Sequence, residues 1–432
     1  MTVQEQNEKL TRKRWSVLIA CCVANLCIGA IYAWSVFSGP MAEHLNILYG
    51  TALSASDLAI AFSVANGTGF ITMILGGYLD EKIGARLIIM IGVVVFGLGM
   101  VVCSFAKSVT ALVVGFGLMC GPANGFAYVC TVSNTVKLFP DKKGLIGGVC
   151  TASIGISAVI IPPIADALNQ SVGVCKAFLI FGGVIISLGV ICAMFIVNCP
   201  ENYVPTGWDS NNTDVKIGGA EDKTAKQMLA SPIFYVMLGM LFVGCCLGLM
   251  MISEASTVAQ SMLGVSTTTA AMVVSALAFF NTGGRIAAGW ISDRIGRINT
   301  LTSVYIVAIA ALLLMYLGGS KGSFILFLIG ICLIGLCYGS FMGVYPGFTS
   351  DIFGMKYHSL NYGIMFIGFS AAGFVGPLLL QTVYRIQGTY LPALLIAAAF
   401  SVVGFALTYI YRKMLYGKWE ESNSVCSEEA KR

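Results

Sequence analysis

Twelve apolar stretches make up most of this chain, and their lengths limit what it can fold into. A helix needs roughly 20 apolar residues to cross the hydrocarbon core of a bilayer. The stretches cover residues 15–37, 57–79, 87–106, 109–136, 145–168, 174–197, 233–258, 267–291, 300–318, 322–347, 361–382 and 388–412. A composition that is 57% hydrophobic and only 10% charged also excludes an ordinary soluble domain. We therefore expect an all-α membrane protein with twelve transmembrane helices and no cleavable signal peptide, because the first stretch is too long for one.

The basic residues predict how these helices are oriented. If both termini are cytoplasmic, 20 of the 25 Lys and Arg residues fall on the inner side. The outer loops then hold only Lys107, Lys176, Lys321 and Arg385. Cytoplasmic loops carry such an excess of positive charge. We expect a multi-pass protein of the cell (plasma or inner) membrane with both termini cytoplasmic. The net charge of +5 follows from this bias, so the lipid bilayer is an expected partner and nucleic acid is not.

One short motif occurs twice, once in each half of the chain. Residues 77–86 read GYLDEKIGAR and residues 289–297 read GWISDRIGR, and both follow the pattern Gly-x-x-x-acid-base-Ile-Gly. A repeat at half the chain length is typical of secondary transporters built from two similar halves. We expect two pseudo-symmetric six-helix halves, a cytoplasmic linker between them and a cytoplasmic tail, at residues 1–197, 231–412, 198–230 and 413–432 respectively.

Each copy of the motif indicates a latch between helices at the cytoplasmic surface. Gly77 and Gly289 permit close helix contact. Glu81 and Asp293 can accept hydrogen bonds from the N-terminus of a neighbouring helix, where the dipole favours negative charge. The basic members of the latch are Lys82, Arg86, Arg294 and Arg297. Such a cluster can hold two halves together in one state and release them in the other. The alternative is a charged loop that only enforces topology.

The spans, the duplicated loop and the central linker resemble the major facilitator superfamily over nearly the whole chain. Three shorter stretches resemble the oxalate/formate antiporter family, bacterial relatives of the monocarboxylate transporters: FPDKKGL at 139–145, SDIFG at 350–354 and NYG at 361–363. The resemblance implies the major facilitator fold, a monomer and transport by alternating access. It also implies that Tyr32, Tyr128 and Tyr338 lie where aromatic residues line a central cavity.

Arg285 is the basic residue that this topology leaves inside a span. It lies eight residues before Asp293, hence about 12 Å from the cytoplasmic end and near the bilayer midplane. An arginine at that depth costs at least ~2.5–3.5 kcal/mol, which makes it a candidate functional residue. Its planar fork suits a carboxylate. The alternative is a structural ion pair, but the spans offer no acidic residue at comparable depth.

Two further positions bear on the substrate. Asn281 lies one helical turn before Arg285. The pair resembles the eighth helix of monocarboxylate transporters, where animal members carry a proton-linked aspartate. Asparagine cannot titrate, but it can orient the arginine or donate to a substrate oxygen. Phe369 stands where the oxalate/formate antiporter carries a second buried cation, a lysine. Because one cation balances one carboxylate, dianionic oxalate would leave an uncompensated buried charge, and a monocarboxylate is expected instead.

The tyrosines and the remaining acids have weaker signals. A phenol offers an apolar wall and one hydrogen bond, which suits a small organic anion, although aromatic residues in spans are more often core or interface anchors. Glu254 and Asp166 lie near the outer ends of their spans. Because burial raises a carboxyl pKa, either acid could take up a proton and couple it to the anion. The alternative is an acid exposed at the outer interface.

These features predict a secondary active transporter of a small monocarboxylate such as lactate, pyruvate or formate, by proton symport or anion exchange. The alternatives are a carrier for another solute, such as oxalate, another organic anion or a drug, and an anion sensor that does not transport. An enzyme is not expected, because no Ser-His-Asp set or nucleotide loop is evident. The 15 cysteines and two histidines lack metal-ligand spacing, so no metal or cofactor is expected either.

Overall fold

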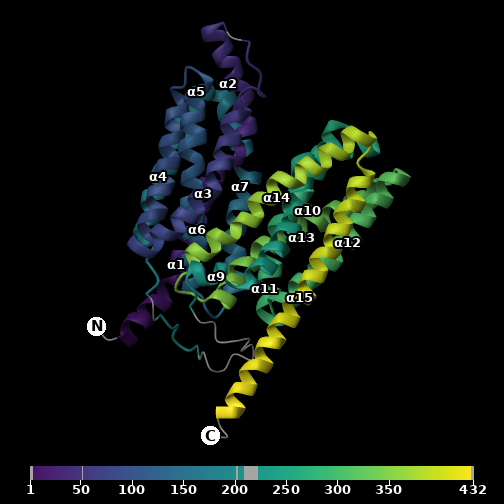
Figure 1. Ribbon diagram of the computed structural model, residues 1–432. Coiled ribbons are helices and arrows are strands. Elements are labelled where there is room, and N and C mark those ends of the chain that lie inside the picture. Colours follow the sequence, from purple (N-terminus) through teal and green to yellow (C-terminus); the bar gives the residue numbers. More distant parts are fainter. Residues whose placement is uncertain (1–2, 51, 201–202, 209–221, 430–432) are drawn as a thin grey trace. The chain divides into compact units, whose positions relative to one another are not determined.

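The computed structural model describes residues 3–50, 52–200, 203–208 and 222–429, and nearly all of them are helical (Figure 1). The elements up to Phe195 are α1 (Val3–Ile28), the 3₁₀ turn η1 (Gly29–Ala33), α2 (Trp34–Tyr49), α3 (Ala59–Ile83), α4 (Ala85–Ser104), α5 (Val109–Leu112), the π-helical segment η2 (Val113–Cys120), α6 (Gly121–Leu138), α7 (Lys143–Val172) and α8 (Val174–Phe195). The later elements are α9 (Ala225–Leu229), α10 (Pro232–Leu263), α11 (Thr267–Ile295), α12 (Arg297–Lys321), α13 (Phe324–Phe353), α14 (His358–Gln387) and α15 (Leu391–Glu429).

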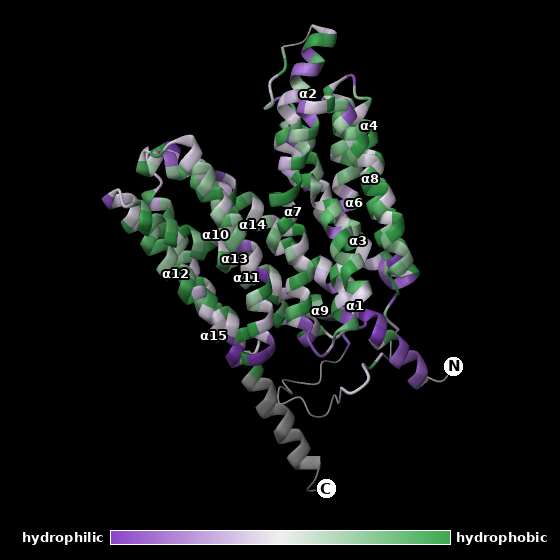
Figure 2. Cartoon of the chain, turned by 180° about the vertical axis from the view of Figure 1, so that it is seen from behind, coloured by the Kyte–Doolittle hydropathy of each residue, from purple (hydrophilic) through white to green (hydrophobic). Residues whose placement is uncertain are grey.

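The helices confirm the predicted all-α membrane fold. Eleven helical segments of the described chain are long and apolar enough to cross a bilayer. α3 is bent by 40° between Gly69 and Ile71, and it makes a twelfth span when its two parts are counted together. The first span is the run α1–η1–α2 and the fourth is α5–η2–α6, so every predicted apolar stretch has its helix. Hydrophobic residues follow the lengths of the helices, and hydrophilic ones gather towards helix ends (Figure 2).

The described residues pack as two compact units. Unit 1 comprises the described residues up to Ala225 together with Arg285–Asp293 and Met342–Phe366. Unit 2 comprises Lys226–Gly284, Arg294–Phe341 and the described residues from Ile367 onward. Each of α11, α13 and α14 therefore contributes part of its length to unit 1. Contacts between these helix parts and the chain up to Ala225 are therefore contacts within unit 1.

The linker and tail predicted from the sequence fall only partly within the described chain. Residues 201–202 and 209–221 of the linker lie outside it. The described end of the linker is held in unit 1, where the Lys223 N–H donates to Phe353 O at 2.9 Å and Asn361 Nδ2 donates to Lys223 O at 2.8 Å. α15 (Leu391–Glu429) includes residues 413–429 of the predicted tail.

Glycines set the closest helix contacts in unit 1. On α4 and α8, a Cβ on Gly97 would come 2.8 Å from Gly182 O, and a Cβ on Gly182 would come 2.7 Å from Gly97 O. Small residues at such crossings let two backbones approach closely, as is common between transmembrane helices. The close packing of α4 on α8 therefore depends on both glycines lacking a side chain.

Adjacent glycines on α8 offer a matched test of this packing. A Cβ on Gly182 would come 2.6 Å from Val101 Cγ2, whereas a Cβ on Gly183 would meet no atom within 4 Å. We predict that Gly182→Ala lowers the unfolding temperature of the purified protein, because overpacking typically costs about 1–3 kcal/mol. Gly183→Ala should leave that temperature unchanged or raise it slightly. Equal unfolding temperatures for the two variants would contradict the close α4–α8 contact.

Candidate functional site

Arg285 lies in the part of α11 that belongs to unit 1, and it is only 6% exposed. Its Nη1 donates a hydrogen bond of 2.7 Å to the main-chain carbonyl of Thr151 in α7. α7 and α13 reach this point because small residues face the arginine backbone. A Cβ on Gly148 or on Gly343 would collide with Arg285 O. The guanidinium is therefore a buried charge positioned by a neighbouring helix backbone.

Three tyrosines of unit 1 lie close enough to Arg285 for its charge to act on their hydroxyls: Tyr32, Tyr128 and Tyr362. Tyr128 and Tyr362 are buried, whereas Tyr32 is 44% exposed. The rings of Tyr128 and Tyr362 both meet Phe366 edge to face, with centroid distances of 5.5 and 5.0 Å. The turn η1, helix α6 and one end of α14 thus place phenols and an apolar ring around one buried cation.

The hydroxyl of Tyr362 is fully buried. It faces Tyr128 but makes no hydrogen bond of ordinary geometry. Leaving a buried hydroxyl unsatisfied costs about 1–3 kcal/mol, and a polar ligand could supply the missing partner. Tyr362 is not among the substrate residues predicted from the sequence, although it lies in the NYG stretch at 361–363. Thr151 gave no sequence signal at all, because it acts through its main-chain carbonyl.

The other two predicted substrate residues belong to unit 2. Asn281 is 8% exposed and lies one turn before Arg285 on α11. Tyr338 on α13 is 5% exposed, and a Cβ on Gly248 of α10 would collide with it. Both side chains are thus buried on helices that span the two units.

Each of the two predicted proton-coupling acids has an amide partner. Glu254 on α10 is half-buried in unit 2 and accepts a hydrogen bond of 2.9 Å from Gln381 Nε2. Asp166 on α7 is exposed in unit 1 and accepts one of 2.9 Å from Gln170 Nε2. In both cases the hydrogen-bond donor is a neutral amide and not a cation.

The second motif copy contacts the first turn of α7. Asp293 accepts hydrogen bonds from the backbone N–H groups of Gly144 and Leu145, both at 2.8 Å. A Cβ on Gly289 would collide with Gly144 O, so the glycine permits this approach. A carboxylate on the free N–H groups of a helix start also interacts favourably with the helix dipole.

The first motif copy lies against the first turn of α14. The Glu81 carboxylate is near the backbone N–H of Leu360. A Cβ on Gly77 would come 2.5 Å from Ser359 O. The preceding residue, Asp80, was not predicted as part of the latch, yet it is 8% exposed and lies 3.8 Å from Lys137 Nζ.

The basic residues of the motif have more varied surroundings. Lys82 is exposed, with Nζ 4.4 Å from the centre of the Tyr78 ring. The backbone N–H of Arg86 donates to Asn198 Oδ1 at 2.8 Å, which connects α4 to the chain after α8. Arg294 and Arg297 follow Asp293 and belong to unit 2.

Two ion pairs involve the stretches that carry the subfamily resemblance. Arg14 pairs with Asp141 at 2.6 Å and lies over the Phe139 ring, and Lys143 pairs with Asp351 at 2.8 Å. Both pairs are within unit 1, and the second joins the start of α7 to the end of α13. Because they are partly solvated, each contributes little stability by itself.

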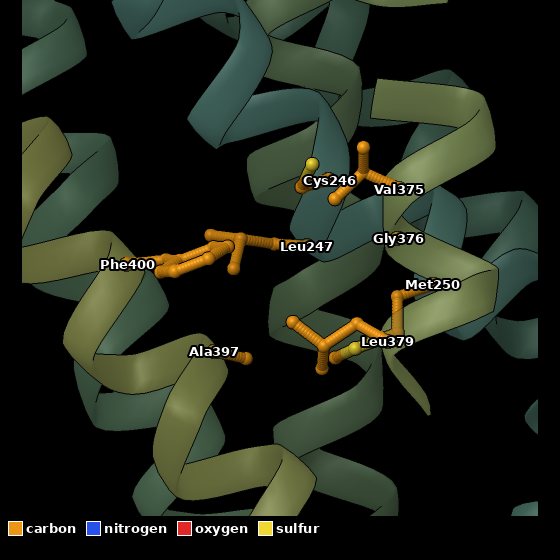
Figure 3. A pocket seen from close by; sticks show the side chains of 8 residues that line it. All are labelled: Cys246, Leu247, Met250, Val375, Gly376, Leu379, Ala397 and Phe400. Carbon is orange, nitrogen blue, oxygen red and sulfur yellow. The ribbon is translucent and has the colours of Figure 1, made fainter. Parts of the chain in front are cut away.

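A pocket in unit 2 is lined by eight residues of α10, α14 and α15: Cys246, Leu247, Met250, Val375, Gly376, Leu379, Ala397 and Phe400 (Figure 3). All of these side chains are apolar or carry a weakly polar thiol. A small anion entering this pocket would lose its hydration without compensation. The pocket therefore does not suit the predicted substrate.

Two buried tyrosines allow the role of the Tyr362 hydroxyl to be tested. The Tyr305 hydroxyl donates to Met240 O, so we predict that Tyr305→Phe destabilises the protein by about 1–3 kcal/mol. Tyr362→Phe should not destabilise it, because that hydroxyl has no partner of good geometry. Thermal unfolding of both purified variants measures the difference. A loss of the same size for Tyr362→Phe would mean that its hydroxyl supports the fold.

Comparison with known proteins places the chain among transporters. It is 29% identical to the MFS-type transporter YhjX of Escherichia coli (strain K12) over 366 residues, which are 83% of this chain and 85% of YhjX. It is 26% identical to the Oxalate:formate antiporter of Oxalobacter formigenes over 415 residues, 95% of this chain and 94% of the antiporter. It is 25% identical to Monocarboxylate transporter 12-B of Danio rerio over 420 residues, 91% of this chain and 84% of that protein.

The fold agrees with a solved transporter structure. FucP, a Major Facilitator Superfamily transporter in the outward conformation, superimposes with a TM-score of 0.65 at 17% identity, over 90% of this chain and 98% of FucP. The family model of the Major Facilitator Superfamily matches residues 17–377. With a match over most of its length and the same fold, the chain belongs to the Major Facilitator Superfamily.

Proposed function

We propose that the chain is a secondary active transporter of a small monocarboxylate anion, of the lactate, pyruvate or formate class, that works by alternating access. The buried guanidinium of Arg285 carries this proposal. Its fork of N–H donors matches the two oxygens of a carboxylate. An arginine placed at membrane depth is costly, and binding an anionic substrate offsets that cost.

The residues around Arg285 suit a short organic acid. Arg285 would hold the carboxylate, while the hydroxyls of Tyr128 and Tyr362 would donate hydrogen bonds to substrate oxygens. The Phe366 ring, which contacts both tyrosines, would pack against the carbon chain. Tyr32 of unit 1 is proposed as a further substrate contact. Asn281 and Tyr338, which belong to unit 2, stay predicted substrate residues.

The charge of the substrate follows from the count of cations proposed to contact it. Phe369 occupies the position to which the family resemblance assigns a second cation. With Arg285 alone facing the substrate, a monoanion would be neutralised and a dianion would keep an uncompensated charge. Proton symport and anion exchange are both compatible with a monoanion.

Transport of oxalate in exchange for another organic anion is the second candidate. The 26% identity to an Oxalate:formate antiporter over 95% of this chain favours it. Under this alternative the chain would exchange one organic anion for another, oxalate included. Oxalate transport therefore separates the two candidates.

We propose that the two motif copies act as latches during the cycle. Each copy presents a carboxylate to the N-terminal turn of a helix, Asp293 to α7 and Glu81 to α14. The predicted six-helix halves, 1–197 and 231–412, would separate at these contacts when the transporter changes state. We also propose that the protein lies in the cell membrane as a monomer, with both termini on the cytoplasmic side.

The central prediction concerns Arg285. In proteoliposomes we expect uptake of labelled lactate, pyruvate or formate by the wild type. Arg285→Gln should weaken the binding free energy of the substrate by about 2–5 kcal/mol, because a hydrogen-bonded charge pair is lost. Uptake should fall accordingly. Arg285→Lys should also impair uptake, since the charge remains but the fork does not.

Arg385, an exposed residue on α14, supplies the control. Arg385→Lys should transport like the wild type. Unchanged uptake by Arg285→Gln would rule out Arg285 as the anion site. Oxalate uptake equal to that of the monocarboxylates would favour the exchange alternative.

The latch makes a separate kinetic prediction. Asp293→Asn should lower the maximal transport rate and leave KM nearly unchanged, because Asp293 is proposed to touch α7 and not the substrate. Interactions of this type are worth roughly 0.3–2 kcal/mol, so about a 2- to 30-fold decrease is expected. Glu81→Gln should have the smaller effect, because Glu81 is exposed. Wild-type rates in Asp293→Asn, or a change in KM alone, would argue for a loop that only sets topology.

A further inference from the structure

A row of four buried polar side chains connects three helices of unit 1. Asp80 of α3 contacts the hydroxyl of Ser359 in α14, whose Oγ lies 2.6 Å from Ser133 Oγ in α6. Ser133 Oγ in turn lies 2.9 Å from His358 Nδ1. His358, Ser133 and Ser359 are fully buried and Asp80 is 8% exposed. We call this row, Asp80–Ser359–Ser133–His358, the polar relay.

The far end of the relay fixes one proton on the histidine. His358 Nε2 lies 2.9 Å from Pro346 O, and a main-chain carbonyl can only accept a hydrogen bond. Nε2 therefore carries a hydrogen. In a neutral imidazole, Nδ1 is then an acceptor and needs the Ser133 hydroxyl as its donor.

The number of hydrogens does not match the number of contacts. The three contacts Asp80–Ser359, Ser359–Ser133 and Ser133–His358 each need one hydrogen between their heavy atoms. With Asp80 ionised and His358 neutral, only the two serine hydroxyls supply one. One contact would then join two acceptors in a buried site, which is unfavourable.

A single added proton completes the relay in two ways. In one form, a protonated Asp80 donates to Ser359, Ser359 to Ser133, and Ser133 to His358 Nδ1. In the other form, every hydrogen has moved one contact along, so that His358 is the cation and Asp80 the carboxylate. Both forms hold the same number of protons, and in both forms Ser359 Oγ can accept from Lys137 Nζ, 3.4 Å away.

We propose that the polar relay binds one proton from water, and that this proton is the one coupled to anion transport. The proposal rests on the proposed function and names the coupling ion and its site. Asp80 and Ser133 come from the part of unit 1 that ends at Ala225, and Ser359 and His358 come from the segment Met342–Phe366. The proton thus stabilises the packing of these two segments, and their separation breaks the row and releases it.

The relay also reaches the proposed anion site. The Tyr362 ring stacks on the His358 ring, with centroids 5.6 Å apart and planes 8° from parallel. The charge of Arg285 acts on the hydroxyl of Tyr362. Tyr362 therefore lies between His358 and the buried guanidinium. Through this tyrosine, a change in the protonation of His358 can alter anion binding at Arg285.

The charged and titratable groups that face the relay come from five segments: Glu81 on α3, Cys130 and Lys137 on α6, Lys143 on α7, Asp351 on α13 and Cys199 after α8. Lys143 and Asp351 are paired with each other. Lys137 lies 3.8 Å from Asp80 and favours its ionised form, but the same positive charge opposes a protonated His358, so Lys137 does not select one of the two forms.

Asp80→Asn is the most informative variant. The amide can donate permanently to Ser359, so the row is complete without an added proton. In proteoliposomes we expect this variant to exchange external for internal monocarboxylate like the wild type. It should lose accumulation driven by an inward proton gradient, and a pH dye inside the vesicles should show the loss of coupled proton entry.

Ser133→Ala divides the row and should lose the same coupling. Glu8→Gln, in an exposed i,i+4 ion pair, is the control and should retain both activities.

Unfolding temperature provides a readout that does not depend on transport. Unfolding frees His358 to take up a proton near its ordinary pKa of about 6.5. On acidification through this pH, from about pH 8 to pH 5, Asp80→Asn loses stability because its folded row takes up no proton, whereas the wild-type relay already holds one and keeps its stability. The gap between the unfolding temperatures of wild type and Asp80→Asn should therefore change across this range. A wild type that moves no monocarboxylate would overturn the proposed function, and the pH dependence of this gap would still decide whether the relay binds a proton.

Two results would overturn the relay. One is gradient-driven accumulation that persists in both Asp80→Asn and Ser133→Ala. The other is loss of proton coupling in Glu254→Gln or Asp166→Asn while both relay variants remain coupled. A constant gap in unfolding temperature across the pH range would also contradict proton binding by the relay.

Discussion

A charge or polar group removed from water must find a partner, and this requirement explains most of what is specific in the structure. In the bilayer core an arginine is tolerated only where protein or ligand compensates it. Arg285 donates to the carbonyl of Thr151, and glycines on α7 and α13 let those helices come near it. The same requirement applies to the carboxylates of the duplicated motif, which are directed to the N–H groups that helix starts leave unpaired.

The internal repeat makes one departure from symmetry visible. Gly77 and Glu81 meet the start of α14 as Gly289 and Asp293 meet the start of α7. The position before the motif acid differs, because the first copy has Asp80 and the second has Ser292. Ser292 bonds within its own helix, to Gly289 O. Asp80 instead reaches Ser359 of another helix, so the polar relay arises where the two copies are unlike.

Sequence patterns predicted the elements well and their partners poorly. Apolar length alone gave the spans, because membrane thickness fixes how long a crossing helix must be. The position of Arg285 inside an apolar span was also readable, since it depends only on counting residues along one helix. Thr151, Tyr362 and the contact between Asp80 and Ser359 were not predicted. They depend on which helices meet and at what height, and spacing along a single helix carries no such information.

The central claim is that Arg285 holds a substrate carboxylate, and a direct distance measurement tests it. Solid-state NMR can detect the proximity of a ¹³C-labelled carboxylate carbon of a bound monocarboxylate to ¹⁵N-labelled arginine side chains in the reconstituted protein. We expect a dipolar contact within about 4 Å, as a bidentate pair requires, and its disappearance in Arg285→Lys. A bound anion whose contact persists in Arg285→Lys, or that shows no arginine contact in the wild type, would rule out Arg285 as the carboxylate site.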